Sequence, residues 1–324
     1  MLKLISIILL FLLTSCSVQR ITEVLFIASI GIELEDDSLV GYFYLPSSED
    51  VGKSSELNDG IGQYAKIKAD NISMLFGKSQ AYTEMEMDLK HVASIIINYQ
   101  LLTPEFIDEM LAYFKNTTIC DLNFYLFITK DKMDDIFTFQ NPNKESVINS
   151  VLVSTSDSSA SFLSCNPLHY LNFCRDYLLN KCLKLPFLSV DKIWNVDKEE
   201  IVSYHLTEMV LFYNNVAKVV NSSLGFYMKK NTHFVDEMGA CPYEIKDYDF
   251  NLKVKDKIEI DIVFKYRYLS DVNHSMNEII HNNIKEFIQR YESMDPLNIN
   301  YYSYVYNKDL KYEDLIINVK STMF

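Results

Sequence analysis

The chain has 324 residues, a formal net charge of −14 at pH 7, and a composition that is 48% hydrophobic and 13% aromatic. This apolar content excludes a disordered stalk for most of the chain, and the length suits two or three cores better than one. The acidity argues against a nucleic-acid partner, because we find no basic patch to offset repulsion from the phosphates.

The first sixteen residues predict a lipoprotein signal. Lys3 supplies one positive charge, residues 4–13 form an unbroken apolar run, and small residues lead to a cysteine. This is the layout of a secretory signal peptide that ends in a bacterial lipobox. The lipobox residues are Leu13, Thr14, Ser15 and Cys16. We therefore expect residues 1–15 to be the signal peptide, Cys16 to carry a diacylglyceryl group, and residues 16–23 to form a tether.

Two alternatives to the lipobox are a transmembrane helix and an unlipidated secretory cleavage. Ten apolar residues cover only about 15 Å as a helix, whereas the hydrocarbon core of a bilayer is about 30 Å thick. An unlipidated cleavage does not explain the cysteine that follows Leu-Thr-Ser directly. Two acyl chains suffice for a stable anchor, so Cys16 alone is expected to hold the protein on the outer face of the membrane.

The N-terminal module is expected over residues 24–196. Residues 24–33 and 39–45 predict two strands joined as a hairpin by the acidic turn at 35–37. Residues 91–99 and 122–129 predict buried strands. A helix capped by Thr103, with Pro104 at its first position, lies between them, so the order is a βαβ unit with parallel strands. Other expected elements are a strand at 64–69, helices at 71–87, 131–139 and 167–182, and an extended segment at 187–196. Whether this module splits near residues 141–166 is left open.

The C-terminal module is expected over residues 201–324, after a charged run at 197–200 that is typical of a module boundary. Residues 208–221 predict a hairpin that turns at Asn214 and Asn215, because asparagine tolerates positive φ. Residues 258–268 alternate between apolar and charged side chains, which indicates an antiparallel sheet with one solvated face. A long amphipathic helix at 276–291 and a strand at 315–319 complete it.

These patterns predict a multi-domain α+β protein with mixed β-sheets, each packed with helices. The C-terminal module is a mostly antiparallel sheet with one long helix.

We find no catalytic, metal or cofactor site in the sequence. The two Gly-Lys-Ser strings lack the upstream glycine of a phosphate-binding loop, and the odd number of cysteines after Cys16 includes no C-x-x-C pair. Cys174 and Cys182 are expected on one helix as buried thiols. The six histidines form no metal-binding spacing, and His91 is interpreted as a buried hydrogen-bonding group at the entry of its strand. The histidines are His91, His169, His205, His233, His274 and His281.

Three features together resemble the Ger(x)C lipoproteins, the C subunits of spore nutrient germinant receptors. They are the lipobox at Cys16, the step Ile30-Gly31-Ile32-Glu33 at the end of an apolar strand, and Lys90-His91 ahead of the apolar run 92–97. The order of elements that follows is similar as well. One departure is Ser17-Val18, where the family usually has Trp-Asp, and another is the scarcity of glycine.

The resemblance implies a non-enzymatic, elongated protein of three domains. It would be anchored by lipid on the outer face of the spore inner membrane and would assemble with polytopic A-type and B-type membrane subunits to trigger germination in response to nutrients. It gives no cofactor and no ligand residues beyond Cys16.

Two other functions fit a secreted, anchored chain of this size. One is an extracytoplasmic solute-binding lipoprotein of a transporter, which predicts two matched α/β lobes around a cleft; the antiparallel character of residues 258–268 argues against it. The other is a secreted hydrolase with an unrecognised site, which predicts a deep pocket lined by convergent acids or histidines.

Overall fold

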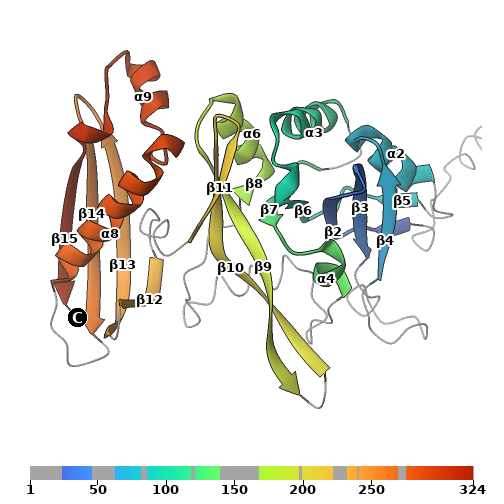
Figure 1. Ribbon diagram of the computed structural model, residues 1–324, viewed down its shortest axis with the longest axis horizontal. Coiled ribbons are helices and arrows are strands. Elements are labelled where there is room, and N and C mark those ends of the chain that lie inside the picture. The colour runs from blue at the N-terminus through green and yellow to red at the C-terminus, as the bar shows by residue number, and fades with distance from the viewer. Residues whose placement is uncertain are drawn as a thin grey trace, which may run out of the picture.

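The computed structural model describes residues 24–45, 63–81, 86–117, 121–138, 168–196, 199–221, 232–238, 241–268 and 275–323. In this part of the chain, the strands form a nine-stranded sheet, a four-stranded sheet and a two-stranded pair. Figure 1 shows the four-stranded sheet at one end of the long axis and the N-terminal strands at the other. The described part is therefore a mixed α+β structure with several sheets, which confirms the predicted fold class.

The nine-stranded sheet begins with a meander of β2 (Ser29–Glu35), β3 (Ser38–Leu45) and β4 (Gln63–Ala69), all antiparallel neighbours. The β2–β3 turn places Asp36 and Asp37 at φ values of 50° and 61°. A two-residue turn with positive φ at both positions matches the twist of a hairpin. The predicted hairpin is thus confirmed. A short strand before it, β1 (Val24–Phe26), pairs with β5 (Glu86–Asp88).

The centre of this sheet is parallel. Strand β6 (Ser94–Asn98), helix α3 (Pro104–Asn116) and strand β7 (Tyr125–Thr129) form the predicted βαβ unit, and β6 also pairs in parallel with β2. Thr103 caps α3 by accepting a hydrogen bond from the Phe106 N–H, and Pro104 occupies the first turn. A cap and an N-terminal proline each fix the start of a helix locally, which is why sequence locates it well.

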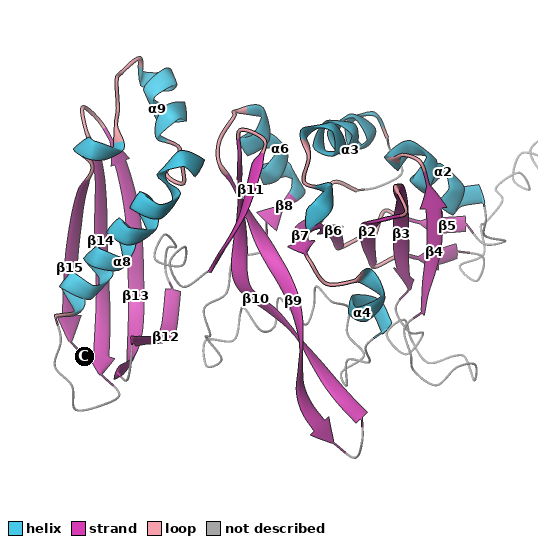
Figure 2. Cartoon of the chain, viewed as in Figure 1, coloured by secondary structure: helices cyan, strands magenta, loops and turns pink. Residues whose placement is uncertain are grey.

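Helices cover both faces of the sheet (Figure 2). Helices α2 (Ile72–Ala81) and α3 contribute to one apolar cluster, and α4 (Met133–Thr138) contributes to the other. Strand β8 (Leu168–His169) pairs with β7 and leads into α6 (Tyr170–Leu178). This helix starts later than expected because residues 168–169 pair with β7 instead of entering the helix.

Strands β9 (Leu183–Val196), β10 (Glu199–Tyr213) and β11 (Val216–Asn221) extend the same sheet as antiparallel neighbours. The turn at Asn214 and Asn215 has φ values of 48° and 64°, as the asparagine pair predicts. The sheet continues past the expected module boundary, because β10 pairs with β9 across it. The pairing places residues 199–221 with the N-terminal strands.

The four-stranded sheet has the order β12 (Thr232–Met238), β13 (Cys241–Val254), β14 (Ile258–Tyr268) and β15 (Ile316–Met323). The first three strands are antiparallel, whereas β15 is parallel to β14. Helix α8 (Met276–Tyr291) connects those two parallel strands. The alternation in β14 is as predicted, with Ile258, Ile260 and Ile262 buried toward the core.

Between α8 and β15 lie the short helices η4 (Glu292–Met294), α9 (Ile299–Tyr306) and η5 (Tyr312–Asp314). In the described part of the chain, no helix combines the length and apolar character needed to cross a bilayer.

Candidate functional site

The residues that the sequence singled out most strongly, Cys16 and the lipobox residues Leu13, Thr14 and Ser15, lie outside the described residues. Lipid attachment at Cys16 thus stays a prediction. The open split near residues 141–166 also falls outside the described ranges.

The interpretation of His91 as a buried group is wrong. Its side chain is 66% exposed, and its Nε2 lies 3.8 Å from Oδ2 of Asp88. Its ring packs loosely against that of Phe26, with centroids 5.5 Å apart. The residue lies in a turn ahead of β6, which begins three residues later at Ser94. The apolar run thus begins before the strand does: Val92 at its start is buried, whereas His91 ahead of it is exposed to solvent.

The described residues hold no group of three or more His, Cys, Asp or Glu side chains that could bind a metal ion. His169 lies at the start of α6, and the centroid of its ring is 4.0 Å from the centroid of the Tyr125 ring. His281 lies on α8. The structure thus does not bring these two histidines together with His91.

The Ile-Gly-Ile-Glu step of β2 has a specific packing role. Alternate residues of a strand face opposite sides of the sheet, and Ile30 and Ile32 are buried in the cluster with α2 and α3. Gly31 faces α4 instead. A Cβ at this position would lie 2.5 Å from Cε2 of Phe137 and 2.7 Å from Sδ of Met133. Glycine is therefore required for α4 to pack directly on the strand.

Glu33 fixes the start of the same helix. Its Oε2 accepts a hydrogen bond from the Met133 N–H at 3.1 Å, and its Oε1 accepts one from the Tyr42 hydroxyl at 2.6 Å. A carboxylate at a helix N-terminus satisfies a free N–H group and favours the helix dipole. Asp134, in the first turn, accepts the Tyr64 hydroxyl at 2.8 Å. Burial and these carboxylates raise the pKa of Tyr42 well above its ordinary value.

A second buried polar group lies where the chain leaves α8. Asp295 is 1% exposed and adopts the left-handed conformation. Its Oδ1 accepts the Ile299 N–H at 2.6 Å and the Tyr312 hydroxyl at 2.8 Å, and its Oδ2 accepts the Asn300 N–H at 3.0 Å. Burial raises the pKa of the Asp295 carboxyl, and these hydrogen bonds oppose that rise. Asp295 thus holds the first turn of α9 in place.

The segment that Asp295 shapes reaches across to the nine-stranded sheet. Oδ1 of Asn298 accepts the Cys182 N–H, just before β9, at 2.7 Å. Nδ2 of Asn300 donates to the Tyr213 hydroxyl, at the end of β10, at 3.0 Å. We call these two contacts, together with Asp295, the junction. The sequence placed the end of the long helix here but gave Asp295 no role, because its partners are distant in the sequence or are backbone groups.

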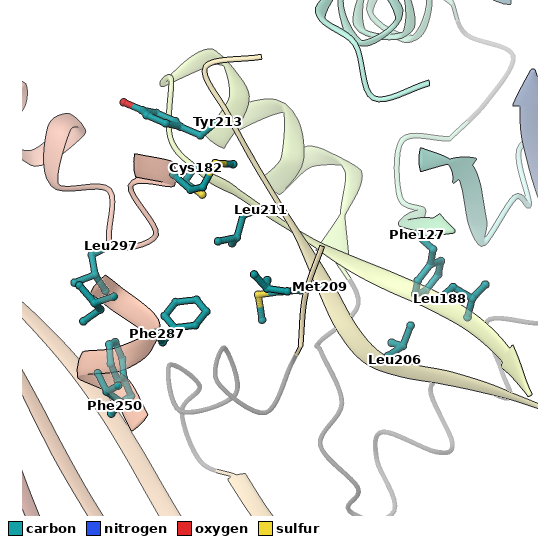
Figure 3. Packing of buried hydrophobic residues seen from close by; sticks show 14 of the residues in the cluster. Phe127, Cys182, Leu188, Leu206, Met209, Leu211, Tyr213, Phe250, Phe287 and Leu297 are labelled. Carbon is teal, nitrogen blue, oxygen red and sulfur yellow. The ribbon is translucent and has the colours of Figure 1, made fainter. Parts of the chain in front are cut away.

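Apolar packing accompanies the junction. Met209 and Leu211 of β10 belong to the same buried cluster as Phe287 of α8 and Leu297. Figure 3 shows these side chains in the space between β10 and the C-terminal helices. The two sheets therefore share one core, and the junction is not a solvated linker.

A hollow of about 500 Å³ opens beside the junction. Its lining residues come from the end of α6 and from the β10–β11 turn: Tyr177, Leu178, Asn180, Lys181, Phe212, Tyr213, Asn214 and Asn215. The Lys181 Nζ lies 4.1 Å from the centre of the Tyr301 ring of α9, which joins the hollow to α9. Its lining has no paired acids or histidines, so it offers polar contacts and no acid–base pair.

The two cysteines of this region differ from expectation in two respects: they do not share a helix, and Cys174 is half-buried instead of buried. Cys182 is buried, as predicted, but it precedes β9 and does not share a helix with the half-buried Cys174. Asn180, with φ of 50°, follows the end of α6. Residues in that conformation terminate helices. Both thiols are free.

We expect Cys182 to be almost inert to iodoacetamide in the folded protein at pH 8. Burial raises the pKa of its thiol to about 12, so the reactive thiolate at pH 8 is roughly one part in 10⁴. Site-resolved mass spectrometry should show labelling of Cys182 about 1,000-fold slower in the folded chain than in urea, and the rate should rise with pH. Cys174 serves as the internal control and should react faster. Equal rates for folded and unfolded Cys182 would contradict this view.

The chain matches the family described as "Spore germination protein N-terminal domain" over residues 17–190. Among curated proteins, none matches the chain significantly. Among solved structures, the crystal structure of the GerBC protein is similar, with a TM-score of 0.43 and 13% sequence identity over 90% of this chain and 96% of that one.

Proposed function

The chain belongs to the Ger(x)C family of spore germination proteins, and from this membership we propose that it is the lipid-anchored C subunit of a nutrient germinant receptor. The family match over residues 17–190 carries the proposal, because it covers more than half of the chain. Membership in this family makes the protein a membrane-associated receptor subunit, whereas its particular partners and its trigger are part of the proposal.

The proposed anchor is the diacylglyceryl group on Cys16. Two acyl chains bind a bilayer stably, so no spanning helix is needed. The lipobox sequence and the family's role at a membrane support this assignment.

The proposed action is non-enzymatic. The protein would hold polytopic A-type and B-type subunits in an assembly through its folded surface and would take part in triggering germination when nutrients are present. The shared core at the junction supports such a role, because a rigid body can fix the spacing of its partners. The solute-binding alternative expects two matched lobes, and the unequal nine-stranded and four-stranded sheets of the described residues argue against that.

We expect Cys16→Ser to move the protein from the membrane fraction to the soluble fraction and to slow nutrient germination. The reason is that serine cannot form the thioether to diacylglycerol, whereas the fold downstream is untouched. Spore membranes would be fractionated and probed by immunoblot, and germination followed by the fall in optical density after nutrient addition. Ser17→Ala, next to the anchor, is the matched control.

Two outcomes would contradict the proposal, one for the need of the lipid anchor and one for the receptor role. Normal germination by a soluble Cys16→Ser protein would refute the need for the anchor. Normal germination with every nutrient after deletion of the whole gene, in a strain without a second copy, would refute the receptor role itself.

A further inference from the structure

The outer edge of β15 is open and regular. Among the described residues, no strand pairs with that edge, since β15 is the last strand of the four-stranded sheet. Its eight residues pair with β14 in one unbroken register, from Ile316 to Met323. Edge strands are normally protected by proline, bulges, short length or charged side chains, lysine above all. Here Lys320 is the single charge and proline is absent. The edge strand β12, by contrast, carries a register shift.

A groove runs beside this edge. It has a volume of about 340 Å³ and lies between one stripe of α8 and the start of β15. Ile288, Leu315 and Ile317 give it an apolar floor, and the aromatic ring of Tyr312 adds to that floor. A strand next to a helix-lined groove is the arrangement in which proteins bind extended peptides by adding a strand: the backbone gives affinity, and the groove accepts alternate side chains.

The charges at the two ends of the groove differ in sign. Lys285 lies in the second half of α8, seven residues before Glu292, and His281 lines the groove one turn ahead of Lys285. Glu292 and Glu313 lie beyond the C-terminal end of that helix. Helix α8 connects two parallel strands, so it runs opposite to β15. A strand added antiparallel to β15 would therefore run with α8. Its N-terminal part would meet Lys285, and its C-terminal part would meet the two glutamates.

We propose that the edge of β15 and this groove bind an extended segment of a partner protein as an antiparallel fifth strand. The segment carries an apolar side chain for the groove, with an acidic residue before it and a basic residue after it. This charge order follows from complementarity with Lys285 and the two glutamates. The proposal concerns binding alone, so it stands or fails separately from the germination role.

The test is selection of a displayed library of random twelve-residue peptides on the full-length chain in detergent micelles. The expected peptides have the order acidic, apolar, basic. Synthetic copies should protect the backbone amides of β15 from hydrogen exchange. Fluorescence anisotropy should give a Kd about 10-fold weaker for Lys285→Glu, because the reversal places two negative charges together. Lys218→Glu, an exposed lysine on β11 in the other sheet, should leave the Kd unchanged.

Several outcomes would overturn the proposal. They are failure to select any peptide, equal binding by Lys285→Glu, unchanged exchange at β15, or binding that shows no preference for the charge order. A dimer in solution that is itself held by β15 would show that a second copy occupies the edge. Circular dichroism of each variant confirms that the fold is intact before binding is measured.

Discussion

Replacing Asp295 with alanine is expected to lower the free energy of unfolding by about 3 kcal/mol, because buried donors lose their acceptor. The carboxylate accepts from the Ile299 N–H, the Asn300 N–H and the Tyr312 hydroxyl in a site that is 1% exposed. Urea unfolding followed by circular dichroism measures the loss. Hydrogen exchange should show the largest increase at the first turn of α9.

The matched control for Asp295 is Asp309→Ala. The Asp309 side chain is 84% exposed and pairs with the exposed Lys311, so its removal should change stability by less than about 0.5 kcal/mol. Tyr312→Phe removes one of the three donors and should cost about 1 kcal/mol. Equal stability of Asp295→Ala and Asp309→Ala would contradict the assigned role of the junction.

Replacing Gly31 with valine is expected to destabilise the N-terminal sheet by about 3 kcal/mol through overpacking. A Cβ would lie within 2.7 Å of both Phe137 and Met133, and both of those side chains are buried. The Phe137 ring and the Met133 side chain would have to shift within a packed core. A shift that also moved α4 would weaken the hydrogen bond between Glu33 and the Met133 N–H. Urea unfolding measures the change.

A second glycine offers the opposite expectation. Gly77 lies in α2, and a Cβ added there would meet no other atom within 4 Å. Gly77→Ala should therefore raise stability by about 0.5–1 kcal/mol, because alanine is the better helix former.

The contact between position 31 and Phe137 can be tested with the double variant Gly31→Ala with Phe137→Ala. Its loss in the free energy of unfolding should be smaller than the sum of the losses of the two single variants, because removing the Phe137 ring relieves the clash with the added Cβ. Strict additivity would show that the contact is not the cause.

Sequence was most informative where the determinants are local. The capped helix α3, the alternation of β14 and the asparagine turn at 214–215 each depend on residues close together in the chain. The junction around Asp295 depends on partners distant in the sequence, which no periodicity identifies. The pairing of β10 with β9 is local, but the charged run between the two strands was interpreted as a module boundary. His91 shows a third kind of limit, because an apolar run does not say where along it a strand begins.

The scarcity of glycine has a structural counterpart. In the described ranges, nine residues other than glycine have positive φ, and all are asparagine or aspartate. These two residue types tolerate the left-handed conformation better than other side chains, because their short polar groups can hydrogen-bond locally. The hairpin turns at Asp36-Asp37 and Asn214-Asn215 are thus made with aspartate and asparagine, and both hairpins form without glycine at these positions.

The parallel pairing of β15 with β14 also sets an order of events during synthesis. Strand β14 ends at Tyr268 and its partner begins at Ile316, so α8 and α9 must be made before the pair can form. Pairings between distant segments form late, and an unpaired strand edge exposed in the meantime is prone to aggregate. The β13–β14 hairpin can form early, whereas the edge of β14 that pairs with β15 stays unpaired until the chain has been synthesised as far as Met323. A nascent chain halted before that point is the form that most needs a chaperone.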